Sequence, residues 1–412
     1  MTEEARLDKD LAIIERGVEE IIGIEDLKNK LLRFYQTGKP LVIKEGFDPS
    51  APDIHLGHTV TLRKLRQFQD LGHQVVFLVG DFTGRIGDPT GKSETRRQLS
   101  EEEVKRNAET YAQQASKILD FEKIVIEFNS KWLSKLTLAD LIEITSHITV
   151  ARMLEREDFA KRLKAGKPVG LHEFLYPVMQ GYDSVALQAD VELGGRDQRF
   201  NLLVGRDLQR EFGQEPQVVI TMPLLEGTDG IEKMSKSLGN YIGINEPPFI
   251  MFGKVMSIPD SLIEKYFLLV TDVPTEEIKK MKAEYEKGEL HPRDWKKRLA
   301  FEIVRMYHGQ KEAILSQEDF ERAFSQKEMP EEAREIMVSS SLLKEGKIWI
   351  LKLLQETGVP YSKSELRRLI EQGGVYFNGE RISNVNTDLE IKDGDYLKVG
   401  KKDFFRIRLK EN

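Results

Sequence analysis

Two histidines separated by two residues stand where an anion could be bound. The sequence His55-Leu56-Gly57-His58 follows a short apolar segment and precedes a helical pattern, so it occupies a junction between a strand and a helix. Two imidazole N–H donors beside the positive end of a helix dipole suit a phosphate. Gly57 would let a flat base approach the backbone closely. The plainer alternative is a surface pair, and the remaining histidines show no metal-ligand spacing.

A second stretch combines lysines and serines in a loop. Residues 233–237 read KMSKS and lie between a glycine-rich stretch at 227–230 and Gly239. Two lysines three residues apart on a flexible loop could swing onto a triphosphate as it becomes pyrophosphate. A Lys/Ser loop by itself is more often solvated surface. The two stretches together, in this order, favour nucleotide chemistry, although the chain has no P-loop and no GxGxxG motif.

A third group of polar residues shares one face of a predicted helix. Tyr176, Gln180 and Asp183 stand at positions i, i+4 and i+7, beside an apolar stripe that would pack against the core. Polar groups on a buried helix must have partners. The face therefore predicts either an internal hydrogen-bond network or a pocket that binds a polar substrate.

The elements that must position these residues alternate between strands and helices. Helical patterns cover residues 8–20 and 24–35, and a mixed-charge helical segment at about 130–171 interrupts the alternation as an insertion. Apolar segments typical of buried strands occur at residues 40–44, 74–80, 123–127 and 217–221. This alternation predicts an α/β fold with a Rossmann-like, doubly wound parallel sheet, whose ligands bind at the carboxyl edge of the strands.

The composition changes along the chain and predicts several domains. Ser362 and Glu365 form a capping box, and Asn378-Gly379 is a strong hairpin signal. We predict a Rossmann-like domain at 1–238, an all-helical domain at 239–338, a linker at 339–346 and a small α+β domain at 347–412.

The composition excludes several classes of protein. The 412 residues are 40% hydrophobic and 32% charged with a net charge of −7, so basic surface must be local. The absence of cysteine excludes disulfides, thiolate metal sites and cysteine nucleophiles. With no long apolar run for a membrane or a signal, we expect a cytoplasmic protein. The last domain holds 13 Lys and Arg against 10 Asp and Glu.

The joint occurrence of HLGH and KMSKS resembles the paired signatures of the class I aminoacyl-tRNA synthetases. The resemblance extends over nearly the whole chain. The stretches 46–50 (GFDPS), 84–88, 176–183 and 194–198 (GGRDQ) are similar to the bacterial tyrosyl-tRNA synthetases. The tail resembles the RNA-binding domain that these enzymes share with a ribosomal small-subunit protein. The resemblance thus implies that 1–238 is the catalytic domain, that 239–338 binds tRNA and that 347–412 binds RNA.

The resemblance implies a reaction in two steps. Tyrosine and ATP give tyrosyl-adenylate and pyrophosphate, and the tyrosyl group then passes to the 3′ end of tRNA(Tyr). ATP is then a substrate, accompanied by Mg²⁺, and no resident metal is expected. The family also implies a homodimer without membrane partners, with the insertion at 130–171 as the interface.

The resemblance also assigns site residues. Catalysis falls to Ser50, His55, His58, Lys233 and Lys236. ATP binding falls to Gly57, His55, His58, Gly194, Gly195, Asp197, Lys233, Met234, Ser235, Lys236 and Ser237. Tyrosine binding falls to Lys44, Gly46, Asp48, Asp88, Tyr176, Gln180, Asp183 and Gln198, with Asp183 accepting the phenol hydroxyl, a contact that phenylalanine would leave unmade. In the tail, we predict that RNA phosphates meet Lys363, Arg367, Arg368, Lys401, Lys402, Arg406 and Arg408.

One position departs from the commoner pattern of the family. Many members have a tyrosine, the second contact to the phenol hydroxyl, where this chain has Lys44 at the end of the first core strand. A lysine here resembles another bacterial branch. Its ammonium could meet Asp183, Asp81 or solvent.

Three other functions compete with this interpretation. A tryptophanyl-tRNA synthetase resembles the chain across the catalytic core, but that family is not known for the RNA-binding tail. A non-catalytic RNA-binding paralogue would have no reason to keep both histidines and both lysines. A small-molecule adenylyltransferase would not need a helical domain and an RNA-binding tail.

Overall fold

The computed structural model describes residues 2–48, 54–90, 101–325, 333–343, 346–378, 380–400 and 403–410. The chain divides into two compact units. The first holds residues 1–245 and 261–286, and the second holds residues 246–260 and 287–412. In the described part of the chain, no helix combines the length and the apolar character needed to cross a membrane.

A six-stranded sheet, counted over the described residues, forms the core of the first unit. Its strands, in the order β1-β6-β5-β2-β3-β4, are β1 (Glu20–Ile22), β6 (Val218–Met222), β5 (Val191–Gly195), β2 (Val42–Phe47), β3 (Gln74–Val79) and β4 (Ile124–Phe128). All neighbours are parallel except β1, which pairs antiparallel with β6. The predicted Rossmann-like fold is confirmed, and the strand order reverses between β2 and β5.

Two strands of this sheet were not expected from the sequence. The first predicted helix ends earlier than expected, at Glu15, and the chain then forms the edge strand β1. Three residues are too few to show a strand period. Strand β5 was missed because Glu192 interrupts its apolar run, and the structure buries this carboxylate completely.

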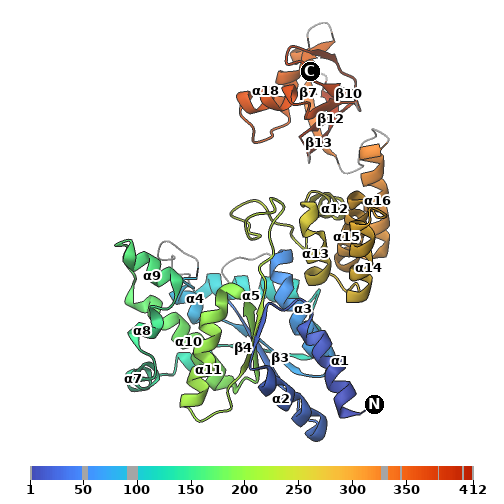
Figure 1. Cartoon of the computed structure of the whole chain (residues 1–412). Coiled ribbons are helices and arrows are strands. Elements are labelled where there is room, and N and C mark those ends of the chain that lie inside the picture. Colours follow the sequence, from blue (N-terminus) through green and yellow to red (C-terminus); the bar gives the residue numbers. More distant parts are fainter. Residues whose placement is uncertain are drawn as a thin grey trace. The chain divides into compact units, whose positions relative to one another are not determined.

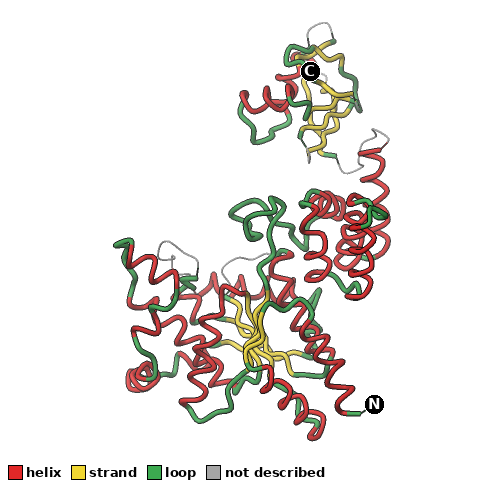
Figure 2. The backbone as a smooth tube through the Cα atoms, viewed as in Figure 1, coloured by secondary structure: helices red, strands yellow, loops and turns green. Residues whose placement is uncertain are grey.

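Helices cover both faces of the sheet (Figures 1 and 2). On one side lie α10 (Leu171–Leu187) and α11 (Arg199–Glu211), and on the other lie α1 (Glu3–Glu15) and α3 (Leu56–Asp70). The unit also holds α2 (Ile24–Thr37), α4 (Thr83–Ile86), α5 (Glu101–Ala115), the 3-10 helix η1 (Arg196–Gln198), α13 (Ile263–Val270) and α14 (Thr275–Glu286). Because both faces are covered, strands β3 and β6 are buried almost throughout.

The segment between β4 and α10 is helical. It contains α6 (Ser130–Leu133), α7 (Leu138–Ser146), α8 (Val150–Met153) and α9 (Glu157–Lys164). Ile144 and Met153 pack on the outer side of α10 and α11, against Val178 and Leu208. This packing fixes the segment beside the carboxyl edge of the sheet.

The second unit contains two sets of elements. The helices α12 (Pro248–Met256), α15 (Pro292–His308) and α16 (Gln310–Ser325) pack on one another. After them come η3 (Ser340–Leu342), α17 (Ile350–Glu356), α18 (Lys363–Glu371) and the strands β7 (Arg334–Ser339), β8 (Lys347–Trp349), β9 (Val375–Phe377), β10 (Glu380–Ile382), β11 (Asp388–Glu390), β12 (Tyr396–Val399) and β13 (Asp403–Lys410). Over the described residues, five of these strands form one sheet in the order β10-β9-β12-β13-β7.

The last sheet begins earlier than the sequence indicated. Residues 239–346 were expected to hold only helices and a linker, yet β7 pairs in parallel with β13 and buries Ile336 and Val338. Its partner lies about 70 residues later in the sequence, so the short alternating pattern alone did not reveal it. The capping box at Ser362 and the hairpin between β9 and β10 form as predicted.

Candidate active site

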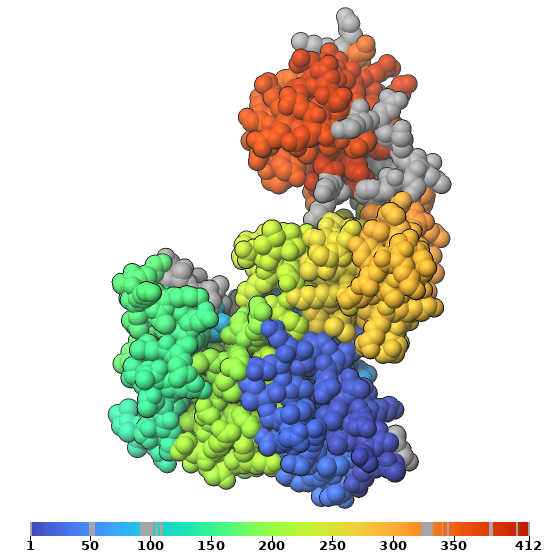
Figure 3. All heavy atoms as spheres, viewed as in Figure 1, coloured from blue at the N-terminus to red at the C-terminus, as the bar shows by residue number. Residues whose placement is uncertain are grey.

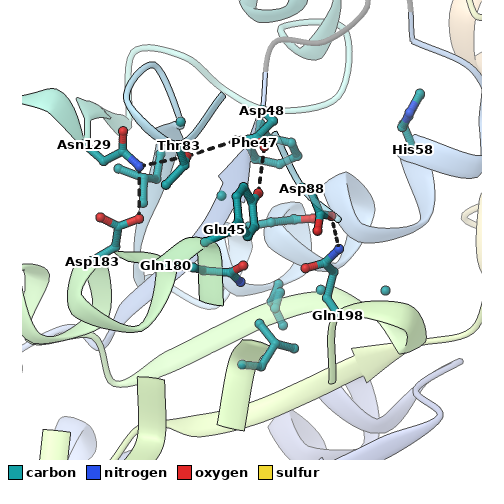
Figure 4. Close-up of a pocket in the computed structure, with 18 of the residues that line it drawn as sticks. Glu45, Phe47, Asp48, His58, Thr83, Asp88, Asn129, Gln180, Asp183 and Gln198 are labelled. Atoms are coloured by element: carbon teal, nitrogen blue, oxygen red, sulfur yellow. Dashed lines mark hydrogen bonds between the residues drawn. The ribbon is translucent and has the colours of Figure 1, made fainter. Parts of the chain in front are cut away.

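A cavity of about 240 Å³ lies at the carboxyl ends of β2 and β5, where the strand order reverses. Figure 4 shows side chains from several elements pointing into it. The predicted tyrosine-binding residues that line it are Gly46, Asp48, Asp88, Tyr176, Gln180, Asp183 and Gln198. The cavity is therefore built from the polar face of α10 together with the ends of two central strands.

One end of this cavity is organised around the buried Asp183. Trp132 Nε1 donates to one carboxylate oxygen at 2.7 Å, and Asn129 Nδ2 donates to the other at 3.2 Å. Burial raises the pKa of Asp183 to about 7, while the charge of Lys44 and these two donors act in the opposite direction. The group can thus accept a hydrogen bond from a hydroxyl when it is ionised.

Two more carboxylates, Asp48 and Asp88, line the same cavity. The Tyr176 hydroxyl donates to Asp48 Oδ2 at 2.7 Å, and Thr83 donates to the other oxygen of Asp48 at 3.0 Å (Figure 4). Gln198 Nε2 donates to Asp88 Oδ2 at 2.8 Å. Two carboxylates beside one small space suit a substrate ammonium group.

A second cavity, of about 730 Å³, adjoins the first. Both are lined by Glu45, Phe47, Asp48, His58, Tyr111 and Gly195. The second cavity brings together the two distant signatures, because its lining includes His55, Gly57, His58, Asp197, Lys233, Met234, Ser235, Lys236 and Ser237. We call residues 233–237 the lysine loop. A ligand that spans both cavities would meet the polar face of α10 at one end and the lysine loop at the other.

The two histidines at the start of α3 are neutral hydrogen-bonding groups at pH 7. Their rings stack with centroids 3.8 Å apart, and the His55 backbone N–H donates to His58 Nδ1 at 3.3 Å. The proton of neutral His58 is therefore on Nε2. Burial, with the charges of Lys236 and Lys233, lowers the pKa of His58 to about 4, and burial also lowers the pKa of His55, to about 2.

The lysine loop lies against the start of α3. The Gly57 N–H donates to Met234 Sδ at 3.4 Å, and a Cβ atom at Gly57 would come within 3.0 Å of the His55 ring. Lys233 Nζ lies 3.2 Å from Asp197 Oδ2. A side chain at position 57 would therefore crowd the His55 ring.

A third hollow opens beside the lysine loop. It has a volume of about 990 Å³ and shares Asp197 and Lys233 with the second cavity. Its other walls come from residues 152–167 and from the start of α11. Figure 3 shows the surface hollowed between the helical segment and the loop that carries KMSKS.

Comparisons with known proteins decide the family. A model described as class I tRNA synthetases (W and Y) matches residues 36–325, and an S4 domain model matches residues 348–395. A tyrosine–tRNA ligase from Moorella thermoacetica is 55% identical, covering 98% of this chain and 97% of its own. One from Carboxydothermus hydrogenoformans is 57% identical, covering 97% and 98%. The chain belongs to the tyrosine–tRNA ligase family.

Solved structures agree with this family in fold. A C-terminally truncated mitochondrial tyrosyl-tRNA synthetase from Coccidioides posadasii has a TM-score of 0.62 at 24% identity, covering 77% of this chain and 95% of its own. The enzyme from Archaeoglobus fulgidus complexed with L-tyrosine has a TM-score of 0.60 at 24% identity, covering 76% and 99%. The predicted tyrosyl family is confirmed, and the tryptophanyl alternative is not supported.

Two of the residues predicted from the tyrosine–tRNA ligase family lie elsewhere than expected. Gly194, predicted at ATP, lines the smaller cavity instead. Lys44, predicted at tyrosine, lies behind that cavity with its ammonium bound to Ser184, Glu192 and the Gln180 carbonyl. The expectation that it meets Asp183, Asp81 or solvent was wrong, because a buried carboxylate on the neighbouring strand is closer. Ser50 lies outside the described residues.

The structure adds residues that sequence reasoning missed. Glu45 lines both cavities, and Asn129 and Trp132 hold Asp183. Arg156 lies 3.5 Å from Asp88 and donates to Thr90 at 2.8 Å. A carboxylate directly before Gly46 in a buried strand was a usable signal, whereas the other contacts join distant segments.

The predicted RNA-binding residues divide into three groups. Lys363, Arg367 and Arg368 are exposed on α18, and Arg406 is half-buried on β13. Lys401 and Lys402 lie outside the described residues. Arg408, on β13, pairs with Glu335 at 2.8 Å and with Asp393 at 3.1 Å, and its contact with RNA stays a prediction.

Proposed function

We propose that this chain activates L-tyrosine with ATP and transfers the tyrosyl group to the 3′ end of tRNA(Tyr). The observation that carries the proposal is the junction of the two cavities at the switch point between β2 and β5. One cavity has the chemistry for an amino acid with a hydroxyl, and the other combines histidines, lysines and glycines that suit a nucleotide. Membership of the tyrosine–tRNA ligase family supports the same reaction.

The first step needs no general base, because the tyrosine carboxylate is already a nucleophile at pH 7. It attacks the α-phosphate, and pyrophosphate leaves. Catalysis then consists of positioning and of stabilising charge on the phosphates. His55 and His58 donate neutral N–H groups to ATP and its α-phosphate, and Lys233 and Lys236 bind the β- and γ-phosphates. Mg²⁺ arrives with ATP as part of the substrate.

The remaining site residues bind the ends of the two substrates. Asp88, Tyr176 and Gln180 hold the ammonium of tyrosine, and Asp183 accepts its hydroxyl. Asp197 and Gly195 lie by the ribose, and Ser50 assists at the phosphates. Glycine backbones let the sugar approach closely.

In the second step, the terminal ribose of tRNA takes the tyrosyl group and AMP leaves. The hollow that adjoins the lysine loop gives the tRNA end a route to the adenylate. The exposed cations of α18, together with Arg406, Lys401 and Lys402, meet RNA phosphates elsewhere. Incubation with ATP, labelled tyrosine and tRNA tests the whole reaction, and charging of tRNA by another amino acid would contradict it.

We further propose that the chain is a cytoplasmic homodimer. Helices α7, α8 and α10 expose the apolar side chains Leu138, Ile142, Val150 and Leu171. The neighbouring edge strand β4 exposes Ile126 and Phe128. Several large apolar side chains exposed on neighbouring segments are typical of an interface. Sedimentation of L138D/V150D should show a monomer where the unmodified chain is a dimer, and an unchanged mass would contradict this interface.

A further inference from the structure

The ammonium of Lys44 is enclosed in the core of the first unit. The side chain has no exposed surface, and three acceptors surround Nζ. Ser184 Oγ lies at 2.7 Å from Nζ, Glu192 Oε1 at 3.0 Å and the main-chain carbonyl oxygen of Gln180 at 3.3 Å. Since an ammonium has three donors, all of them are used.

The carboxylate of Glu192 is equally saturated. Its Oε1 accepts from Lys44 and, at 3.2 Å, from Gln180 Nε2. Its Oε2 accepts from Ser184 at 3.1 Å and from Gln217 Nε2. Helix α11 approaches closely at Gly205, where a Cβ atom would lie 2.7 Å from Gln217 and 2.8 Å from Ser184. The network is therefore tightly packed and leaves Glu192 little freedom.

This network fixes which end of the Gln180 amide faces the cavity. An ionised carboxylate only accepts hydrogen bonds, so the amide group beside Glu192 must be the NH₂. The side-chain carbonyl oxygen of Gln180 then turns the other way, toward the cavity that Gln180 lines with Asp88 (Figure 4). With the amide reversed, an NH₂ group would face a substrate ammonium, and both groups would be donors.

We propose that Glu192, held by Lys44, is a positioning residue for recognition of the substrate's amino group, because it keeps the side-chain carbonyl oxygen of Gln180 turned into the cavity. This inference rests on the proposed tyrosine-binding function. Lys44 is required in turn, because a buried carboxylate without a cation is strongly destabilising. The departure from tyrosine at position 44 then serves the amino end of the substrate and leaves the hydroxyl end to Asp183, Asn129 and Trp132.

The test compares two ligands that differ only in the amino group. Calorimetry measures the Kd of L-tyrosine and of 3-(4-hydroxyphenyl)propionate for the unmodified chain and for E192Q. In E192Q the side chain at position 192 is an amide, which can both donate and accept and so no longer fixes the orientation of the Gln180 amide. We expect tyrosine to bind about ten- to a hundredfold more weakly to the variant, as for a lost hydrogen bond to a charged group. The Kd of the propionate should change less than about twofold. In pyrophosphate exchange, KM for tyrosine should rise while kcat is retained.

Two further variants separate positioning from folding. K44M/E192Q removes both charges and therefore leaves no unpaired buried ion. It should lose affinity for tyrosine but not for the propionate, and it replaces E192Q as the test if E192Q does not fold. The control K30M removes another buried lysine, whose ammonium pairs with Asp190 at 2.9 Å. This control should leave both ligands unaffected.

Equal weakening of both ligands, or an unchanged Kd for tyrosine in E192Q and K44M/E192Q, would overturn the positioning role. Failure of the proposed function is distinguishable, because the unmodified chain would then show no tyrosine-dependent pyrophosphate exchange at all.

Discussion

The ammonium of Lys233 lies 3.2 Å from the carboxylate of Asp197, which joins the lysine loop to η1, directly after β5, beside the cavity of about 730 Å³. The side chains are 55% and 29% exposed. An ion pair at such exposure contributes about 1 kcal/mol or less. Lys233 can therefore leave Asp197 for a phosphate at little cost when ATP binds.

Removing this ammonium should slow the chemistry and spare tyrosine binding. For Lys233→Ala we expect the rate of adenylate formation to fall about a hundredfold, because a donor to the leaving pyrophosphate is lost. His58→Ala should act in the same direction. Rapid-quench measurements give the rate, equilibrium dialysis gives tyrosine affinity, and Lys131→Ala on the exposed surface of α6 is the control. A parallel loss of tyrosine affinity would refute the assignment to ATP.

Tyrosine affinity should depend on pH through Asp183. Because burial raises the pKa of Asp183 to about 7, its acceptor form is lost as the pH falls below that value. The Kd of tyrosine should rise by up to about tenfold per pH unit below 7 and level off above it. In Asp183→Asn the Kd should not vary with pH, and the preference over phenylalanine should fall. A flat profile for the unmodified chain between pH 6 and 8 would count against this role.

The stability of the first unit should carry the signature of Glu45. Burial, together with the charge of Glu192, raises the pKa of Glu45 to about 8, against a hydrogen bond from Thr61, and its Oε2 has no partner among the described residues. The folded state thus holds a proton that the unfolded chain releases near pH 4.5. The stabilisation is complete below pH 4.5 and is lost as the pH rises to 8.

Glu45→Gln should remove this pH dependence. Between pH 5 and 8, the unfolding free energy of the unmodified chain should fall relative to the variant by up to about 1.4 kcal/mol per pH unit. Urea titrations at four pH values measure the unfolding free energy of each protein. The contributions of the other titrating groups cancel in the difference between the two proteins. Parallel curves for the two proteins would show that Glu45 is ionised in the folded chain.

The exposed cations of α18 should contribute to tRNA binding through charge alone. For K363A/R367A we expect weaker tRNA binding at each salt concentration and a smaller slope of log K against log salt. Pyrophosphate exchange should be unchanged. Lys9→Ala, on the exposed surface of α1, is a matched control. An unchanged slope would place the RNA on another surface.

Much of the fold was predictable because local patterns of apolar residues identify most of its strands and helices. The apolar strands β2, β3, β4 and β6 and the alternating helices predict a parallel sheet from the sequence alone. Strand β5 escaped detection because the carboxylate of Glu192 breaks its pattern, and only a lysine on the neighbouring strand makes such a residue tolerable in a core. Strand β7 escaped because its partner lies far along the chain.

The site was predictable where one short segment carries the chemistry. Residue type and spacing alone identify three sets of residues: the histidines of HLGH, the lysines of KMSKS, and Tyr176, Gln180 and Asp183 on one helix face. The partner of Lys44 was not predictable, because the identity of a buried counter-charge depends on which strands are neighbours in space. Asn129 and Trp132 likewise reach Asp183 only through the folded sheet.

The central claim is that two distant segments bind one nucleotide beside a cavity that selects tyrosine. ATP–pyrophosphate exchange with the full chain, screened against each of the twenty amino acids, tests it most directly. We predict exchange with tyrosine alone, slowed about a hundredfold in K233A and slowed likewise in H58A. Exchange driven by tryptophan, or none with any amino acid, would contradict the account.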